Sequence, residues 1–383
     1  SLFPVAFILA YFLVTPPKKI LIAAAILFVG IAAFALTANI IVLAAAAVAA
    51  WSYIKNEENA KTNSGAHTNQ TETKSQNKAE DTQKMQHQTD EDGEKSFYTA
   101  EQASAIMKKL KEMTAKETVH IKATPIADDE SAFEKRAIGS RFGGLPYWTR
   151  GEDFPAGEDG KPLYLLAQIN FSEVPPISDY PARGLLQIFV RADNMWGCDF
   201  NAEQKNWRIV YRDVLTASVA MSAAELHEIG VKSAAEVDEE TGEFPLPLQK
   251  EFALAFEKTT TFIHPNCDDF ENAVKHAAEA LGFATCEKSA YDLFDENTFN
   301  AFFDDTDVLH QIGGYPNFTQ NDARRKGDML LLQMDSQLST DKNGRILSDE
   351  ILWGDVGIAN FFISRDDLTA RNFTNVLYNW DCF

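Results

Sequence analysis

Charge is missing from one long stretch of this sequence. Residues 20–54 contain no Lys, Arg, Asp or Glu, and about 18 such residues already suggest a membrane span. One helix of that length would exceed the hydrocarbon core of a bilayer, which is about 30 Å thick. The polar triplet Thr37-Ala38-Asn39 is therefore interpreted as a break. We expect an N-terminal helical membrane hairpin with spans at about 20–36 and 40–54, preceded by part of an earlier span at 2–14.

Proline and aromatic residues are missing from residues 56–96, which are rich in Asn, Thr, Gln, Lys, Glu and Asp. Such a segment cannot bury enough apolar surface to offset the entropy of its chain. The composition predicts a disordered polar tether over residues 55–97 that serves as a spacer; a recognition motif is the alternative.

Cysteine and basic residues are scarce. The four cysteines lie far apart and form no CxxC pair, which suits a reducing compartment. The chain has 35 basic against 56 acidic residues, a net charge of −21. This balance argues against a nucleic-acid-binding protein, because such proteins need cations for the phosphates.

The few lysines near the apolar segments predict the location of the protein. Lys18 and Lys19 are expected on the cytoplasmic side, and two further spans return the chain there at Lys55. We expect an inner-membrane protein whose large domain, residues 98–383, is cytoplasmic. A single crossing by residues 20–54 would place that domain outside, and a cleaved signal peptide is the alternative for residues 2–14. The true N-terminus stays open.

Local patterns in residues 98–383 predict an α+β domain. Capping boxes indicate helices after Thr99 and after Ser222, and a third helix is expected from Asp268. Strand patterns outnumber helices and do not alternate with them, which favours a mixed or antiparallel sheet. The expected strands are 163–169, 185–190, 207–211, 329–334 and 359–363.

The domain contains an internal repeat of three blocks. The sequence SRFGGLP at 140–146 matches HQIGGYP at 310–316, and YLLAQIN at 164–170 matches MLLLQMD at 329–335. A third match joins 189–193 to 362–366. We therefore predict two interlocked structural repeats packed around a pseudo-two-fold axis.

Strict alternation along the first repeated strand would place Leu165, Ala167 and Ile169 on one face and Gln168 on the other. The polar strand ends of the two repeats can then line one shared cleft. In the alternative, the amides only satisfy buried loop backbone. The candidate cleft residues are Arg141, Gln168, Asn170, Gln333, Asp335 and Trp353.

The combined motifs resemble a known family. GGYP at 313–316, LLQMDS at 331–336, ILWGDVG at 351–357 and YNWDC at 378–382, together with FGGLP at 142–146, are similar to the YwqG-like family of uncharacterised proteins. The resemblance covers residues 120–383 and implies an α+β fold with two interlocked repeats. Some members lie near genes for secreted bacterial toxins, which suggests an immunity role. The apolar and polar N-terminal segments lie outside the family pattern.

Strong catalytic and metal-binding motifs are absent: the sequence has no GxSxG, HExxH, GxGxxG or P-loop pattern. The weak catalytic candidates are His310 as a general base and Asp335 or Asp355 as its orienting carboxylate. The alternative is a histidine that hydrogen-bonds the adjacent turn. We expect no metal and no cofactor: His264 and Cys267 lack a second ligand pair, and Asp341–Gly344 is interpreted as a hairpin turn.

Two functions remain from the sequence. The favoured one is an acidic protein-binding module, related to toxin immunity, whose partner is basic. The alternative is an enzyme or small-ligand binder with a polar cleft between the repeats. The sequence therefore leans away from an enzyme without excluding one, and it names neither substrate nor partner.

Overall fold

The computed structural model describes residues 97–126, 133–200, 202–215, 219–237, 242–286, 288–306, 309–340 and 346–383. Its α-helices are α4 (Ala100–Thr114), α5 (Phe133–Arg136), α6 (Ala223–Glu228), α7 (Phe270–Ala280), α8 (Ala290–Leu293), α9 (Glu296–Thr306) and α10 (Arg365–Ala370). Its strands are β1 (Lys116–Pro125), β2 (Arg141–Phe142), β3 (Tyr164–Asn170), β4 (Leu185–Val190), β5 (Trp207–Arg212), β6 (Phe252–Thr261), β7 (Gln311–Gly313), β8 (Met329–Asp335), β9 (Gln337–Thr340), β10 (Ile346–Ile351), β11 (Ile358–Ile363) and β12 (Leu377–Asp381). Short 3-10 helices cover Ala234–Glu236 and Phe373–Asn375.

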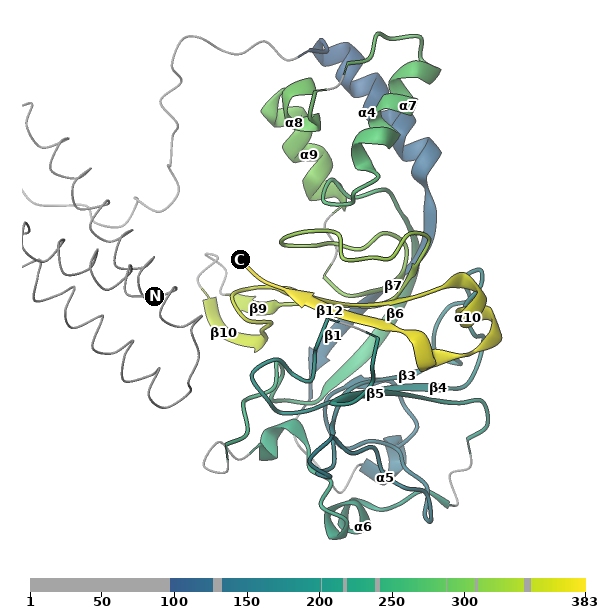
Figure 1. Cartoon of the computed structure of the whole chain (residues 1–383), viewed down its shortest axis with the longest axis vertical. Coiled ribbons are helices and arrows are strands. Elements are labelled where there is room, and N and C mark those ends of the chain that lie inside the picture. The colour runs from purple at the N-terminus through teal and green to yellow at the C-terminus, as the bar shows by residue number, and fades with distance from the viewer. Residues whose placement is uncertain are drawn as a thin grey trace, which may run out of the picture. The chain divides into compact units, whose positions relative to one another are not determined.

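One antiparallel sheet forms the body of the described part (Figure 1). Ten strands follow the order β12-β11-β8-β7-β1-β6-β2-β3-β4-β5, and each neighbouring pair is antiparallel. β9 and β10 form a separate two-stranded sheet. The large sheet curls so strongly that its two edge strands approach each other. The ring of Trp207 in β5 lies 5.4 Å from that of Tyr378 in β12.

The strand order is symmetric about the central pair β1–β6. On one side follow β2, β3, β4 and β5, and on the other follow β7, β8, β11 and β12. β1 precedes β2 in the chain but lies beside β7, whereas β6 precedes β7 but lies beside β2. Each half of the chain thus places its first strand within the other half.

The same β-bulge occurs in both halves. Leu166 is skipped in the pairing of β3 with β4, and Leu331 is skipped in the pairing of β8 with β11. A bulge inserts one residue and reverses the alternation of faces beyond it. Leu166 and Ala167 consequently enter the same core cluster, while Leu165 joins a different one. The expected strict alternation is therefore wrong at this point.

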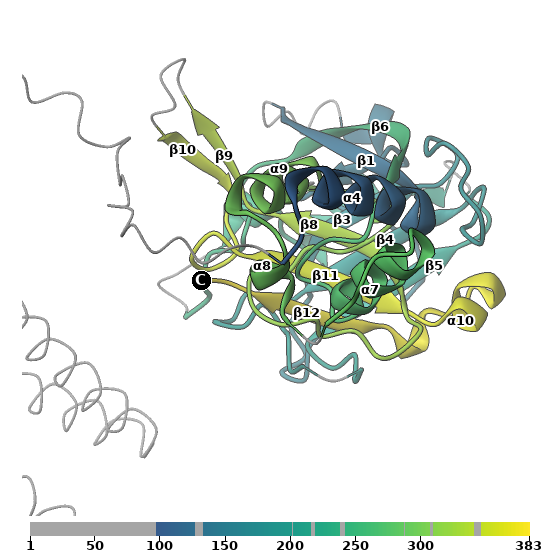
Figure 2. The ribbon, with the colours of Figure 1, turned by 90° about the horizontal axis from the view of Figure 1, so that it is seen from above.

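Three hydrophobic clusters stabilise the sheet. The largest lies inside the curl and includes Trp207, Trp353 and Phe361. A second joins α4, α7, α8 and α9 to the outer side of β8 and β11, and Figure 2 shows these helices gathered over one region of the sheet. The third covers the outer side of β3 and β4. Both faces of these strands are covered, which explains why every residue of β3, β4 and β11 is buried.

Two expected helix starts are confirmed. The Thr99 and Ser222 capping boxes are both formed, at the starts of α4 and α6. The third helix begins one residue later than expected, with Asp269 as its N-cap, while the backbone N–H of Asp268 donates to Asp322. The expected hairpin turn at 341–344 lies outside the described residues, although β9 and β10 on either side of it do pair.

The fold class predicted from the sequence needs correction. The main sheet is antiparallel throughout, helices are few, and no helix in the described ranges is long and apolar enough to cross a membrane. The longest of these helices, α4, carries three lysines and buries four apolar residues on one side only. The expected membrane hairpin and the inner-membrane location are therefore not supported. The predicted spans 2–14, 20–36 and 40–54, and residues 55–96 of the tether, lie outside the described residues.

Candidate functional site

The two glutamines expected to line a cleft are fully buried and occupy equivalent settings. The Gln168 side-chain oxygen accepts the backbone N–H of Tyr147 at 2.9 Å, and that of Gln333 accepts the backbone N–H of Asn317 at 2.8 Å. Tyr147 and Asn317 each follow the proline of their glycine turn. The amide nitrogens donate to carbonyls that precede the same turns. These side chains thus hold the two turns against the sheet.

A second amide completes each network. Gln187 lies beside Gln168 and donates to the Tyr147 carbonyl at 2.8 Å. Asn360 lies beside Gln333 and donates to the Asn317 carbonyl at 2.9 Å. The two networks are copies of one arrangement, as expected for duplicated halves, and they bind backbone of their own half.

Arg141 and Asn170 also serve the first turn. Arg141 is buried, donates to the carbonyls of Ala137 and Leu145, and lies 3.6 Å from the Glu251 carboxylate. Burial lowers the pKa of its guanidinium to about 10. Asn170 donates to the Ile138 carbonyl at 3.1 Å. Arg141 lines a cleft of about 450 Å³ beside β6, but its donors already contact loop carbonyls.

His310 and Asp335 are brought together, although through the backbone. The Nδ1 atom of His310 accepts the backbone N–H of Asp335 at 3.1 Å, and Nε2 lies 3.1 Å from the Gln337 side-chain oxygen. Burial lowers the pKa of His310 to about 4, so its ring is neutral near pH 7. Both ring nitrogens are occupied, which does not suit a general base awaiting a substrate proton.

The remaining two candidates, Trp353 and Asp355, have different surroundings. Trp353 is fully buried, with its ring 5.3 Å from that of Trp196. Asp355 is exposed on the following turn, and within the described ranges no hydrogen bond or ion pair joins it to His310. The structure therefore does not gather Gln168, Gln333, His310 and Asp355 around one cavity.

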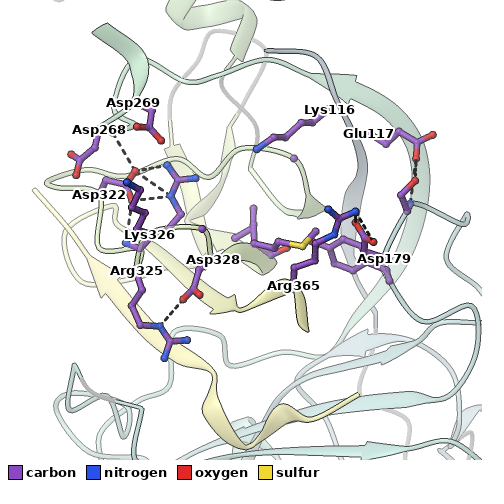
Figure 3. A pocket seen from close by; sticks show the side chains of 17 residues that line it. Lys116, Glu117, Asp179, Asp268, Asp269, Asp322, Arg325, Lys326, Asp328 and Arg365 are labelled. Atoms are coloured by element: carbon purple, nitrogen blue, oxygen red, sulfur yellow. Dashed lines mark hydrogen bonds and ion pairs between the residues drawn. The ribbon is translucent and has the colours of Figure 1, made fainter. Parts of the chain in front are cut away.

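A charged groove of about 710 Å³ lies in the described structure (Figure 3). It lies between the two halves: β1 and the β3–β4 connection contribute from the first, and the β7–β8 connection and the ends of α7 and α10 from the second. The charged side chains that line it are Lys116, Glu117, Asp179, Asp268, Asp269, Asp322, Arg324, Arg325, Lys326, Asp328 and Arg365.

Three ion pairs form within the groove. Arg324 contacts both carboxylate oxygens of Asp322, and its Nε lies 2.9 and 3.1 Å from them. Arg325 binds Asp328 at 2.7 Å, and Arg365 binds Asp179 at 2.9 Å. Outside these pairs, Glu117 binds a lysine on β6. Most carboxylates of the groove are thus matched by their own cation.

Lys116 differs from the three arginines of the groove, which are all paired with carboxylates. Figure 3 shows its side chain extending from β1 into the cavity. Its ammonium lies 3.9 Å from the ring centre of Tyr315 and forms no ion pair among the residues described. Burial of the ammonium, followed by the nearby positive charge of Arg324, lowers the pKa of Lys116. Lys116 therefore has no nearby carboxylate that fully compensates its charge.

Sequence reasoning missed this groove. A signal was present, because Arg324-Arg325-Lys326 is the only run of three consecutive basic residues in an otherwise acidic chain. The contributions of Lys116 and Arg365 were not visible, since these residues reach the groove from distant parts of the sequence.

A smaller open pocket of about 320 Å³ adjoins β12. We call it the aromatic pocket; it is lined by Met195, Phe200, Gln320, Asn321, Ala323, Asn379, Trp380, Asp381 and Cys382. Phe200 is 54 % exposed. The ring of Trp380 lies 4.6 Å from that of Trp196, which in turn contacts Trp353. The lining contains one carboxylate and no cation.

The residues considered for a metal site do not form one. His264 accepts the backbone N–H of Asn266 through Nδ1, and the Cys267 thiol contacts the Pro316 carbonyl. Across the described ranges, no group of three or more His, Cys, Asp or Glu side chains is placed to hold a metal ion.

One family model matches more than half of this chain. No curated protein matches the chain. The family model for a domain of unknown function, DUF1963, matches residues 140–382, from the first glycine turn to the end of β12. This match spans both halves of the sheet and confirms the resemblance to an uncharacterised YwqG-like family. The chain therefore belongs to the family defined by this domain of unknown function.

Proposed function

We propose that this domain is a protein-binding module that holds a basic partner against the aromatic pocket. The observation that carries this proposal is an exposed aromatic side chain, Phe200, that lines a pocket together with Trp380, whose ring belongs to a cluster of three tryptophans. Aromatic residues in such positions supply most of the binding energy at protein interfaces. Exposed apolar groups with a polar rim are typical of interaction sites.

Backbone strain around the pocket supports the proposal. Phe200, which lines the pocket, and Trp196, whose ring contacts Trp380, have positive φ angles of 58° and 49°. Non-glycine residues rarely adopt this conformation, which is costly for bulky or β-branched side chains. Strain of this kind persists where a site requires it. Phe200 in particular is half exposed, so core packing gives little reason for its position.

Charge supports a basic partner. Residues 98–383 carry 27 basic and 47 acidic residues, a net charge of −20. Asp381 lines the pocket, and the exposed Asp199 precedes Phe200 in the chain. A cationic partner would be attracted before contact and aligned at the pocket. An immunity role against a secreted toxin, suggested by the family resemblance, is one form that such binding takes.

The alternative function, an enzyme or small-ligand binder, is favoured by one observation. The charged groove does lie between the two halves, where a ligand cleft was expected, although it is lined by other residues than those predicted. Its described lining contains no Cys or His, and its serine, Ser178, donates to Glu117. This composition is better suited to binding than to nucleophilic catalysis.

Capture experiments test the protein-binding proposal. The immobilised full chain is incubated with cell lysate, and retained proteins are quantified by mass spectrometry. We expect basic proteins that elute at about 0.5 M salt, where charge interactions are screened within a few ångströms. Phe200→Asn should reduce their retention about tenfold or more, because asparagine tolerates positive φ but removes the aromatic ring.

A matched control distinguishes binding at the aromatic pocket from non-specific binding to exposed aromatic side chains. Phe244 is 50 % exposed, close to the value for Phe200, but does not line the aromatic pocket. Phe244→Asn should leave the captured set unchanged. Equal loss in both variants, or retention of acidic proteins only, would contradict the proposal.

A further inference from the structure

Two cations of the charged groove lie outside its ion pairs. Asp322, Asp328 and Asp179 are each engaged by an arginine. Lys116 and Lys326 have no carboxylate within ion-pair distance among the residues described. The exposed Asp268 and Asp269 also line the groove.

The positive charge of Arg324 opposes the charged form of Lys116, whereas Cys267 and Asp269 each favour it. Of these three effects, that of Arg324 is the largest. Two cations held close together at a partly desolvated position gain most from a shared anion. The nearest aromatic group, Tyr315, offers the ammonium only the face of its ring.

The turn that contains Arg324, Arg325 and Lys326 can also reach an anion bound near Lys116. Lys326 is exposed and is followed by Gly327, whose φ of 88° marks a tight turn. Figure 3 shows Lys116 extending into the cavity from the opposite side to this turn. An anionic group between them is reachable from two segments that are distant in the sequence.

The floor of the groove is partly apolar. Met329 and Leu330 line it together with Tyr180, whose hydroxyl donates to the Leu330 carbonyl at 2.6 Å. This hydrogen bond fixes the Tyr180 ring as a wall. A cavity of about 710 Å³ with charged walls and an apolar floor suits a small molecule that has both an anionic group and an apolar part.

We propose that the charged groove binds a small molecule through its oxyanion, a carboxylate or a phosphate, held between Lys116 and the Arg324–Lys326 turn. This site is separate from the aromatic pocket and does not depend on the protein-binding proposal. The guanidinium of Arg324 already binds Asp322. Lys116 and Lys326 therefore provide the direct charge contacts to the oxyanion.

Calorimetric titration of the full chain at low ionic strength tests the site. The probes are inorganic phosphate, as a source of the phosphate group, and succinate, as a source of carboxylates. Lys116→Met should weaken binding about 10- to 100-fold, the usual effect of losing one charge-assisted hydrogen bond. Lys116→Arg keeps the charge and should retain binding within a few-fold.

Lys122→Met is the matched control. Lys122 is exposed on the same strand, six residues from Lys116 and therefore about 20 Å away, and it does not line the groove. Its replacement removes the same charge from the protein but should leave the affinity within about twofold. Equal weakening by the two methionine variants would show only a general charge effect and would overturn the proposal.

A spectroscopic measurement distinguishes direct contact from a structural effect. The pKa of Lys116, followed by NMR of its ε-carbon, should rise when the probe is added, because a bound anion favours the ammonium. Tighter binding of phosphate assigns a phosphate group, and tighter binding of succinate assigns a carboxylate. No binding of either probe at millimolar concentration, or a Lys116 pKa that does not move, would overturn the proposal.

Discussion

His310 is kept neutral by its surroundings rather than prepared for catalysis. It is buried, its Nδ1 accepts a backbone N–H, and its pKa falls to about 4. In the unfolded chain the same ring has a pKa of about 6.5. Protonation therefore favours the unfolded state between these two values. The stabilising contribution is fully present above pH 6.5 and is lost as the pH falls through 4.

His310→Asn should make stability less dependent on pH in this window. From pH 7 to pH 4, we expect the wild type to lose about 3 kcal/mol more unfolding free energy than this variant. Urea denaturation at pH 7, 6, 5 and 4 measures the difference. His276→Asn, at an exposed position on α7, should follow the wild-type curve. Parallel curves for the wild type and His310→Asn would show that His310 does not titrate as described.

The sequence identified the polar side chains that are important in the structure, but not the groups to which they hydrogen-bond. Gln168 and Gln333 were correctly identified as equivalent from the repeated motif. Whether an amide faces a cleft or a loop depends on the path of residues 137–147 and 309–317, which contribute the bonded backbone groups. That path is fixed by tertiary packing, so local patterns did not distinguish the two interpretations that were left open.

At the scale of the element, the second glycine turn allows close approach of three segments. Gly314 has a φ of 73°, and a Cβ there would contact Thr261 and lie 2.9 Å from the Thr118 side chain. Thr118 is fully buried and donates to the Ile312 carbonyl at 3.1 Å. The turn thus packs β7 against the central pair β1–β6. The close packing leaves no space for an added methyl group.

Gly314→Ala should be far more damaging than Gly151→Ala. Gly151 also has positive φ, 83°, but a Cβ there would meet no atom within 4 Å. The backbone conformation costs about 1–2 kcal/mol in both variants, and overpacking adds about 1–3 kcal/mol at Gly314 only. Denaturant unfolding of both variants checks this difference. Equal losses at the two sites would mean that β7 is not packed tightly against β1.

Strand patterns identified β3, β4, β5, β8 and β11, but neither the central pair nor the edge strand β12. β3, β4, β8 and β11 are buried on both faces, and their continuous apolar runs were recognised. β1 and β6 mix exposed and buried positions along ten residues each and carry several charged side chains. Their stability comes from pairing with each other over ten residues, which is a long-range interaction that no local pattern records.

At the scale of the whole molecule, chain order and strand order differ in a way that sequence did not show. The repeat was found, yet the exchange of first strands between the halves follows only from the pairing of β1 with β7 and of β6 with β2. The charged groove has the same origin, because it joins residues of both halves. The prediction of membrane attachment rested on composition alone, and the described helices do not support it.

The exchanged strands imply that neither half folds alone. In residues 1–240, β1 would lack both of its sheet neighbours, β6 and β7, and in residues 241–383, β6 would lack β1 and β2. Each half would then expose edge strands and part of the shared core. We expect each half to remain unfolded or to associate with a second copy of itself. When the two halves are mixed, they should form a one-to-one complex with cooperative unfolding.

Circular dichroism and size-exclusion chromatography of the separate and mixed halves test this expectation. Phe252→Asp in the second half supplies a control, because Phe252 is fully buried where β6 meets both β1 and β2. A charge at that position would be buried without a partner and should prevent assembly. A monomeric half with native-like unfolding would contradict the exchange. It would mean that the β1–β6 pair joins two independent units, and the charged groove would then depend on their docking.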